Sequence, residues 1–168
     1  MKLDIQAAKR SLESKLHKPL LKAAARALNR AADSTATASG REISRLTKIK
    51  TRKVRDKLSV SGATAQRLIA VISAAPYSPN LKEFRPTQNK RGVAASAWER
   101  RKTYKGAFIN PKTGSVVTRK GPGRFPLKGL RGPSVPSTFL QRRVVQMMTD
   151  TALKVFENRF GLELARLT

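Results

Sequence analysis

The residues best suited to chemistry in this sequence form two basic clusters, one near residue 50 and one near residue 100. The predicted contact residues are Lys48, Lys50, Arg52, Lys53, Arg55, Arg100, Arg101, Lys102 and Lys105. Asp56 and Glu99 are the acids within these clusters, so the positive charge has almost no local counterweight. Lysine and arginine at this density bind phosphates or carboxylates, and phosphate contact of this kind does not depend on base sequence. We therefore predict contact with DNA or with an acidic partner; a solvated basic face is the alternative.

Catalytic chemistry has little support among the residues. The single histidine, His17, stands between basic neighbours in a helical stretch and is predicted to be a surface residue. The carboxylates are dispersed, without the paired spacing that holds Mg²⁺ or Zn²⁺, and Ser59, Ser61 and Ser96 have no histidine nearby in the sequence. Residues 121–124 (Gly-Pro-Gly-Arg) lack the Gly-Lys-Ser/Thr ending of a phosphate loop. We predict no enzyme activity, no cofactor and no metal.

Charge and length bound the class of protein. The 168 residues suffice for one domain with a core, and 36 Lys and Arg stand against 10 Asp and Glu, a net charge of +26. Because such a charge repels itself, we expect a polyanion or an acidic neighbour close by. The chain has no cysteine, which fits a reducing cytosol, and no run resembling a signal peptide or a membrane span.

The first third of the chain is predicted to be helical and basic. Apolar residues recur at helical spacing over residues 3–46, interrupted by Pro19, which would kink one helix or begin a second. Thr51 is a candidate N-cap for a short helix that ends near Leu58, with Val54 facing inward. We predict a single domain over residues 1–168. Its helical, basic part comprises residues 1–58.

Residues 59–133 are predicted to form a mostly antiparallel sheet. The predicted strands are residues 66–73, 104–109, 115–119 and 124–131. Residues 110–114 suit a hairpin loop with Gly114 at positive φ, and Pro126 is tolerated only at a strand start or an edge. The proline-rich residues 74–88 are predicted to be a loop that Leu81 and Phe84 anchor.

Residues 134–168 are predicted to form a last helix, from a cap at Ser134 or Ser137 to a stop at Gly161. The fold class is therefore α+β: a long N-terminal helix, the sheet, and a C-terminal helix packed on the sheet. The predicted core of the sheet and the last helix consists of Trp98, Phe108, Leu127 and Phe139. If Phe108 is fully buried, Phe108→Ala should cost about 3–5 kcal/mol.

Four sequence motifs together form a signature: Val93-x4-Trp98-x2-Arg-Lys-x-Tyr-Lys-Gly-Ala-Phe-Ile, Gly123-Arg-Phe-Pro-Leu, Leu130-x-Gly-Pro-Ser-Val-Pro and Ala24-x2-Ala-Leu-Asn-Arg-Ala. This signature resembles the prophage minor tail protein Z family and, more broadly, the tail-completion proteins of long-tailed bacteriophages. The resemblance covers most of residues 20–140. It implies a virion structural protein without catalytic residues, which acts late in tail assembly at the head-proximal end of the tail.

From this resemblance and the charge we expect a minor tail or neck protein that forms a closed ring, six-fold in our prediction, around the DNA path. The ring would support head–tail joining and genome passage, with neighbouring tail tube, terminator or neck proteins as partners. It would lie in the virion and, during assembly, in the host cytoplasm. The alternatives are a free, sequence-independent nucleic-acid-binding protein of architectural or ribosomal type, and a nuclease.

DNA cannot neutralise every basic residue of such a ring. We therefore expect only one of the two basic clusters of each chain to face the DNA. The sequence favours Lys48, Lys50, Arg52, Lys53 and Arg55, because they lie on a short polar segment with little competing apolar surface.

Overall fold

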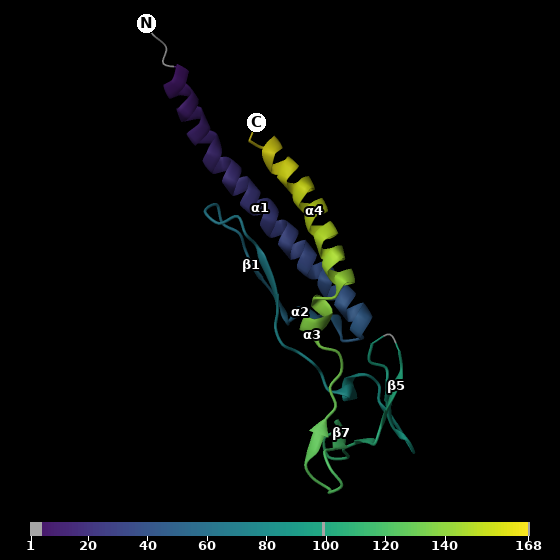
Figure 1. Cartoon of the computed structure of the whole chain (residues 1–168). Helices are drawn as coiled ribbons and strands as arrows, with labels where there is room; N and C mark the ends of the chain where they lie inside the picture. The colour runs from purple at the N-terminus through teal and green to yellow at the C-terminus, as the bar shows by residue number, and fades with distance from the viewer. Residues whose placement is uncertain (1–4, 99, 168) are drawn as a thin grey trace. The chain divides into compact units, whose positions relative to one another are not determined.

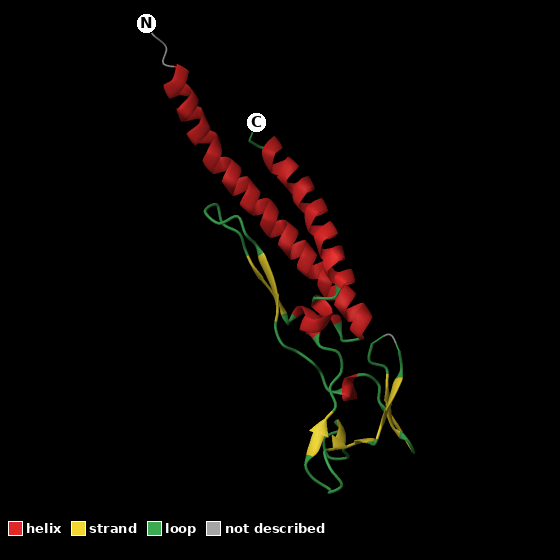
Figure 2. Ribbon diagram, in the orientation of Figure 1, coloured by secondary structure: helices red, strands yellow, loops and turns green. Residues whose placement is uncertain are grey.

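The computed structural model describes residues 5–98 and 100–167, with side chains from residue 17 onward (Figures 1 and 2). The helices are α1 (Ile5–Thr47), α2 (Thr51–Arg55), the 3-10 helix η1 (Leu81–Glu83), α3 (Val135–Phe139) and α4 (Arg142–Ala165). The strands are β1 (Leu58–Ser61), β2 (Val71–Ala74), β3 (Thr87–Asn89), β4 (Gly92–Ala95), β5 (Lys102–Lys105), β6 (Ala107–Ile109), β7 (Val116–Arg119) and β8 (Leu127–Gly129). The predicted α+β class is confirmed.

The chain divides into two compact units. The first unit comprises residues 1–38, 60–73 and 146–168, and the second comprises residues 39–59 and 74–145. Both α1 and α4 therefore contribute to each unit.

The long helix α1 is confirmed, and it continues through Pro19 instead of starting again there. In the first unit its buried face consists of small side chains, among them Ala23, Ala27 and Ala31 at a spacing of four residues. Alanine is the best helix former, and its short side chain lets a neighbouring element approach the backbone closely. His17 is exposed on this helix, as predicted.

Asn29 connects α1 to the segment between β1 and β2 in the first unit. Its side-chain amide donates to the Ala63 carbonyl at 3.0 Å, and its side-chain oxygen accepts from the Ala63 amide at 2.6 Å. This pair of bonds imitates a strand pairing, so a single side chain satisfies both backbone groups of the buried Ala63.

Helix α4 runs beside α1 in the first unit, in the opposite direction (Figure 1). Arg26 of α1 binds Glu163 of α4 at 3.3 Å, and Phe156 stacks on Phe160 with ring centroids 5.4 Å apart. The prediction that Gly161 ends this helix is wrong. Glycine costs about 1 kcal/mol in a helix interior, and contacts beyond it, including that of Glu163, favour continuation to Ala165.

The second unit holds two three-stranded antiparallel sheets, with strand orders β3-β4-β5 and β6-β7-β8. A separate two-stranded sheet joins β1 and β2, so the strands are divided among three small sheets where one was expected. The predicted strand over residues 66–73 is wrong in its first half, because β2 begins only at Val71. Gly106, at φ 69°, breaks the predicted strand over residues 104–109 into β5 and β6.

The hairpin between β6 and β7 is confirmed. Gly114 has φ 64°, and its amide donates to the Asn110 carbonyl at 2.8 Å. Pro126 stands immediately before the edge strand β8, as its missing amide donor requires.

The predicted aromatic core is wrong at Trp98, whose exposed fraction is 40%, and Phe108, Leu127 and Phe139 are only half-buried. The core of the second unit is built from smaller side chains. Its fully buried members include Ile43, Val54, Leu81, Val93, Val116, Val135 and Val144. Six of these seven residues are β-branched, a type of side chain that packs well on the pleated surface of a sheet.

Ser134 precedes the short helix α3, with Pro136 in its first turn, as predicted for the start of the last helix. The helix does not continue, because α3 ends at Phe139 and α4 begins at Arg142. Thr51 is likewise the first residue of α2 and not its N-cap, which is Lys50.

Leu81 is the most deeply buried anchor of the loop before β3. It has no exposed surface, and Phe84 beside it is 3% exposed, which confirms that these two residues anchor the loop. We expect Leu81→Ala to cost about 2–5 kcal/mol of unfolding free energy, and the half-buried Phe108→Ala to cost less. Urea titration would measure both, with Leu140→Ala, at a 72% exposed position, as the control. A larger loss for Phe108→Ala than for Leu81→Ala would contradict this assignment of the core.

Glu42 makes the stability of the second unit depend on pH. Its carboxylate accepts from Arg45 Nε at 2.9 Å and Nη2 at 2.8 Å, and lies 3.2 Å from Arg143 Nε. The hydrogen bond from Arg45 is the main cause that lowers the pKa of Glu42 below its ordinary value of 4.5, against the opposing effect of burial.

Because the folded pKa is lowered, the stabilisation by Glu42 is present above pH 4.5 and is lost as the pH falls through the lowered value. We expect Glu42→Gln to be less stable than wild type near neutral pH and to converge with it in acid. Urea midpoints measured across this range test the expectation, with Glu157→Gln on the exposed side of α4 as the control. A constant difference between Glu42→Gln and wild type at every pH would contradict it.

Candidate functional site

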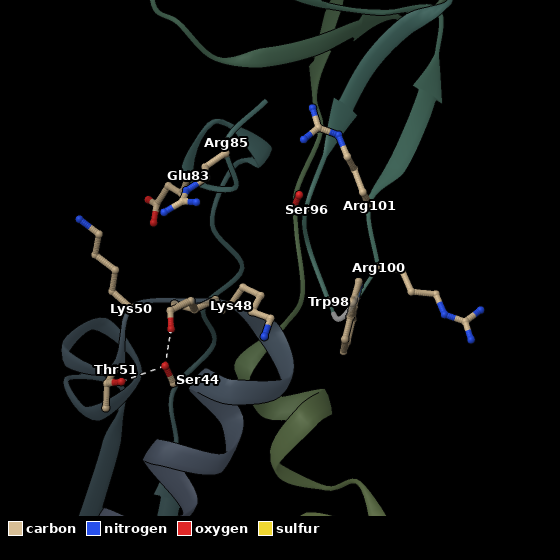
Figure 3. A pocket seen from close by; sticks show the side chains of 11 residues that line it. Ser44, Lys48, Lys50, Thr51, Glu83, Arg85, Ser96, Trp98, Arg100 and Arg101 are labelled. Atoms are coloured by element: carbon tan, nitrogen blue, oxygen red, sulfur yellow. Dashed lines mark hydrogen bonds between the residues drawn. The ribbon is translucent and has the colours of Figure 1, made fainter. Parts of the chain in front are cut away.

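The second unit contains a pocket of about 860 Å³ into which both predicted basic clusters extend (Figure 3). Three chain segments form its walls: residues 44–51, residues 83–85 and residues 96–101. Figure 3 shows the first two segments on one side, and Ser96, Trp98, Arg100 and Arg101 on the other.

The first wall is the turn from α1 to α2. Ser44 Oγ donates to the Ile49 carbonyl at 2.7 Å, and Thr51 Oγ1 donates to Ser44 Oγ at 2.9 Å. The Ile49 side chain is buried in the core and thereby fixes the turn. Lys48 and Lys50 are exposed on either side of this fixed residue.

The second wall is η1 and the residues after it. Asn80 caps η1, because its side-chain oxygen accepts from the Lys82 amide at 3.0 Å. The same side chain pairs with both backbone groups of Val116, at 2.9 and 3.1 Å, and so fastens the loop to β7. The buried Leu81 and Phe84 hold this wall in place, and Arg85 follows them at the surface.

The third wall is the connection between β4 and β5. The Ser96 amide donates to the Phe84 carbonyl at 3.0 Å, which joins this wall to the second. Arg101 Nη2 donates to Thr87 Oγ1 at 2.8 Å, so the guanidinium is held on one side. Arg100 extends away from the other labelled side chains in Figure 3, and thus stands at the rim.

The backbone of each wall contains one residue in the left-handed region. Within the described residues, three non-glycine residues have positive φ: Lys48 at 61°, Arg85 at 49° and Trp98 at 64°. All three line the pocket. This conformation costs about 1–2 kcal/mol per residue, and such residues concentrate at functional sites.

The pocket is strongly positive. Five of its described lining residues are cationic, and Glu83 is the one acid among them. Glu83 already binds Lys53 Nζ at 2.8 Å, and the hydrogen bond to Glu83 raises the pKa of Lys53. The lining therefore keeps an excess of positive charge that an anion would stabilise.

The structure regroups the predicted contact residues. Lys48 and Lys50 of the first cluster share the pocket with Arg100 and Arg101 of the second. The remaining predicted residues that do not line it are Arg52, Lys53, Arg55, Lys102 and Lys105. Glu99 lies outside the described residues.

Arg85 and Trp98 are among the pocket residues that were not predicted as part of a site. Arg85 was assigned only to a proline-rich loop, since it stands alone in the sequence between Phe84 and Pro86. Trp98 was expected in the core. No sequence signal other than the basic residue itself points to Arg85, because the fold alone brings it to Lys48 and Arg101.

The described part of the chain shows neither a metal site nor a membrane-spanning helix. Among residues 17–98 and 100–167, no group of three His, Cys, Asp or Glu could hold a metal ion. None of the described helices combines the length and hydrophobicity that a bilayer crossing requires. What the site offers is therefore recognition of an anion by lysine, arginine and one exposed indole.

Comparison with known families decides the class of protein. The sequence model of the prophage minor tail protein Z (GPZ) family matches residues 4–165. The chain belongs to the minor tail protein Z family. It is accordingly a structural protein of a bacteriophage tail, located in the virion. Comparisons with curated proteins and with solved structures give no match.

The match to the minor tail protein Z family spans every helix and strand that builds the pocket. The pocket walls at residues 44–51, 83–85 and 96–101 all fall inside the matched range. The site is thus embedded in the family domain and is not an appended segment.

Proposed function

We propose that this minor tail protein forms a closed, six-fold ring at the head-proximal end of the tail, around the path of the DNA, and supports head–tail joining and genome passage. The observation that carries the proposal is the unbalanced charge of +26 in a structural tail protein. A component that faces DNA or acidic neighbours gains from such a charge, whereas an isolated chain is destabilised by it.

The exposed surface supports assembly with further chains. Several large apolar side chains of the first unit are more than one third exposed: Leu20, Val60, Leu68, Ile69, Val71, Leu153, Leu162, Leu164 and Leu167. Neighbouring copies in a ring would remove part of this apolar surface from water.

DNA alone cannot neutralise the proposed ring. Six copies of a chain with net charge +26 carry about 156 formal positive charges. Duplex DNA offers one phosphate per about 1.7 Å of axis, so a ring about 40 Å deep faces about 24 phosphates. Most basic residues must therefore meet acidic partner proteins or solvent ions, and a smaller group meets DNA.

Arg52 and Arg55 of α2 are the best candidates for the DNA-facing group. Both are exposed and neither lines the pocket, while Lys53 between them is engaged by Glu83. Phage that carries Arg52→Gln and Arg55→Gln should assemble tails normally, but should retain or eject its genome about tenfold less well, because charged hydrogen bonds to phosphate are lost.

The matched control is Lys102→Gln with Lys105→Gln, which removes the same charge from exposed positions of β5. Genome retention would be measured as the DNA content of purified particles, and ejection as DNA release after receptor addition. Equal defects in the two variants would refute the assignment of α2 to the DNA path. High-affinity DNA binding by the free monomer, without incorporation into virions, would favour a free nucleic-acid-binding protein instead.

A further inference from the structure

We propose that the cation-lined pocket of the second unit binds an acidic peptide segment, with apolar side chains between its carboxylates, from a neighbouring protein of the particle. The proposal rests on the proposed function, in that it assigns a partner to basic residues that the DNA cannot neutralise.

The form of the pocket favours a peptide over duplex DNA. A volume of about 860 Å³ lies within the range of about 300–1,000 Å³ that holds small ligands or a few side chains. The phosphates of duplex DNA line the outside of a broad convex rod, so they meet flat or protruding basic surfaces. An extended peptide can instead insert individual side chains into the pocket, between its three walls.

The charged residues favour carboxylates. Among the described residues, Thr87 accepts from Nη2 of Arg101, and the guanidinium has further donors that suit a planar oxyanion. The guanidinium fork matches a carboxylate in two parallel hydrogen bonds. Lys48 of the first wall and Arg85 of the second provide further donors opposite Arg101. Glu83 does not compete for them, because it already binds Lys53.

Trp98 gives the pocket an apolar wall. Its indole is 40% exposed, beside the charged residues of the same segment. An exposed indole in a recess contributes to peptide binding by covering an apolar side chain, and tryptophan is enriched among the residues that dominate such interfaces. A purely phosphate ligand would leave this surface in water.

The walls are fixed before any ligand arrives. One hydrogen bond, from the Ser96 amide to the Phe84 carbonyl, joins the third wall to the second. An ion pair joins Lys53 of α2, the helix that begins at the end of the first wall, to Glu83 of the second wall. The three left-handed residues, Lys48, Arg85 and Trp98, are maintained within this framework. A prearranged site loses less conformational entropy on binding, which favours affinity.

Trp98 is the one tryptophan of the chain, so its fluorescence reports on the pocket directly. The probe is a synthetic peptide of alternating glutamate and leucine, titrated into the full-length protein. We expect a shift of the emission and a dissociation constant that rises about a hundredfold in the variant Lys48→Gln, Arg85→Gln and Arg101→Gln, since charged hydrogen bonds are lost. The control variant Arg52→Gln, Arg55→Gln and Lys105→Gln removes the same charge outside the pocket, and should change the constant by less than about threefold.

Two further variants keep the test decisive if the triple variant does not fold. Arg101→Lys retains the charge and removes the fork, and Arg85→Gln changes a single exposed side chain; each should weaken peptide binding about tenfold. Equal peptide affinity in the pocket and control variants would overturn the proposal. It would also be overturned if a mixed-sequence DNA duplex shifted the emission in a pocket-dependent way while the peptide did not. Both measurements use the isolated chain, so they do not depend on where in the particle the ring lies.

Discussion

Phage that lacks this protein is expected to make heads and tails but no infectious particles. The chain belongs to a family of structural tail proteins. We therefore expect it to contribute contacts that every particle needs. We expect plaque formation to fall below detection in a deletion phage, and to return when the gene is supplied from a plasmid.

The state of the defective particles is the informative part of this experiment. Electron microscopy should show filled heads and tails of normal length, either separate or joined without successful genome passage. Normal infectivity of the deletion phage would contradict the proposed role. Tails that stop at an early stage of assembly would contradict the head-proximal position and leave only the assignment to the tail.

Gly92→Ala is expected to destabilise the second unit strongly. Gly92 has φ 141°, a conformation that only glycine adopts readily. A Cβ at this position would lie 2.1 Å from the Tyr104 carbonyl oxygen of the paired strand β5. Since a backbone atom cannot move aside as a side chain can, we expect the register of Gly92 with Lys105 to be lost. The expected cost is about 3 kcal/mol or more.

Gly106→Ala is the matched control for this prediction. Gly106 also has positive φ, at 69°, but a Cβ there would meet nothing within 4 Å. Its substitution should cost about 1 kcal/mol, the price of the left-handed conformation alone. Urea titrations of the two variants give the comparison. A loss for Gly92→Ala no greater than that for Gly106→Ala would show that β4 and β5 tolerate a side chain at their pairing.

The loss at Gly92 should extend to the pocket, because β4 and β5 carry the segment with Trp98, Arg100 and Arg101 between them. A change in Trp98 fluorescence in Gly92→Ala, without any ligand, would reveal this connection.

The sequence predicted those parts of the fold that depend on local patterns. The alanine-rich spacing predicted α1, and Gly114 predicted the hairpin, because helical periodicity and positive φ are properties of neighbouring residues. The anchoring of the proline-rich loop by Leu81 and Phe84 was predicted for the same reason, as they are the large apolar residues of a polar stretch.

Predictions that depended on tertiary context were less successful. Gly161 does not end α4, since contacts of the helix with α1 outweigh the low propensity of one glycine. Trp98 is exposed although a single tryptophan in an apolar stretch is commonly buried; it lies in the connection between β4 and β5 with a positive φ, which the sequence pattern did not indicate. The grouping of Lys48 with Arg85 and Arg101 arises only when three distant segments meet.

The central claim, a ring around the DNA path at the head-proximal end of the tail, is tested most directly by cryo-electron microscopy of the intact particle. We predict density for a closed ring of this chain between head and tail, with α2 toward the DNA and the pocket occupied by an extended segment of a neighbouring protein. Density for the chain at the distal tip of the tail, or no density for it in infectious particles, would contradict the account.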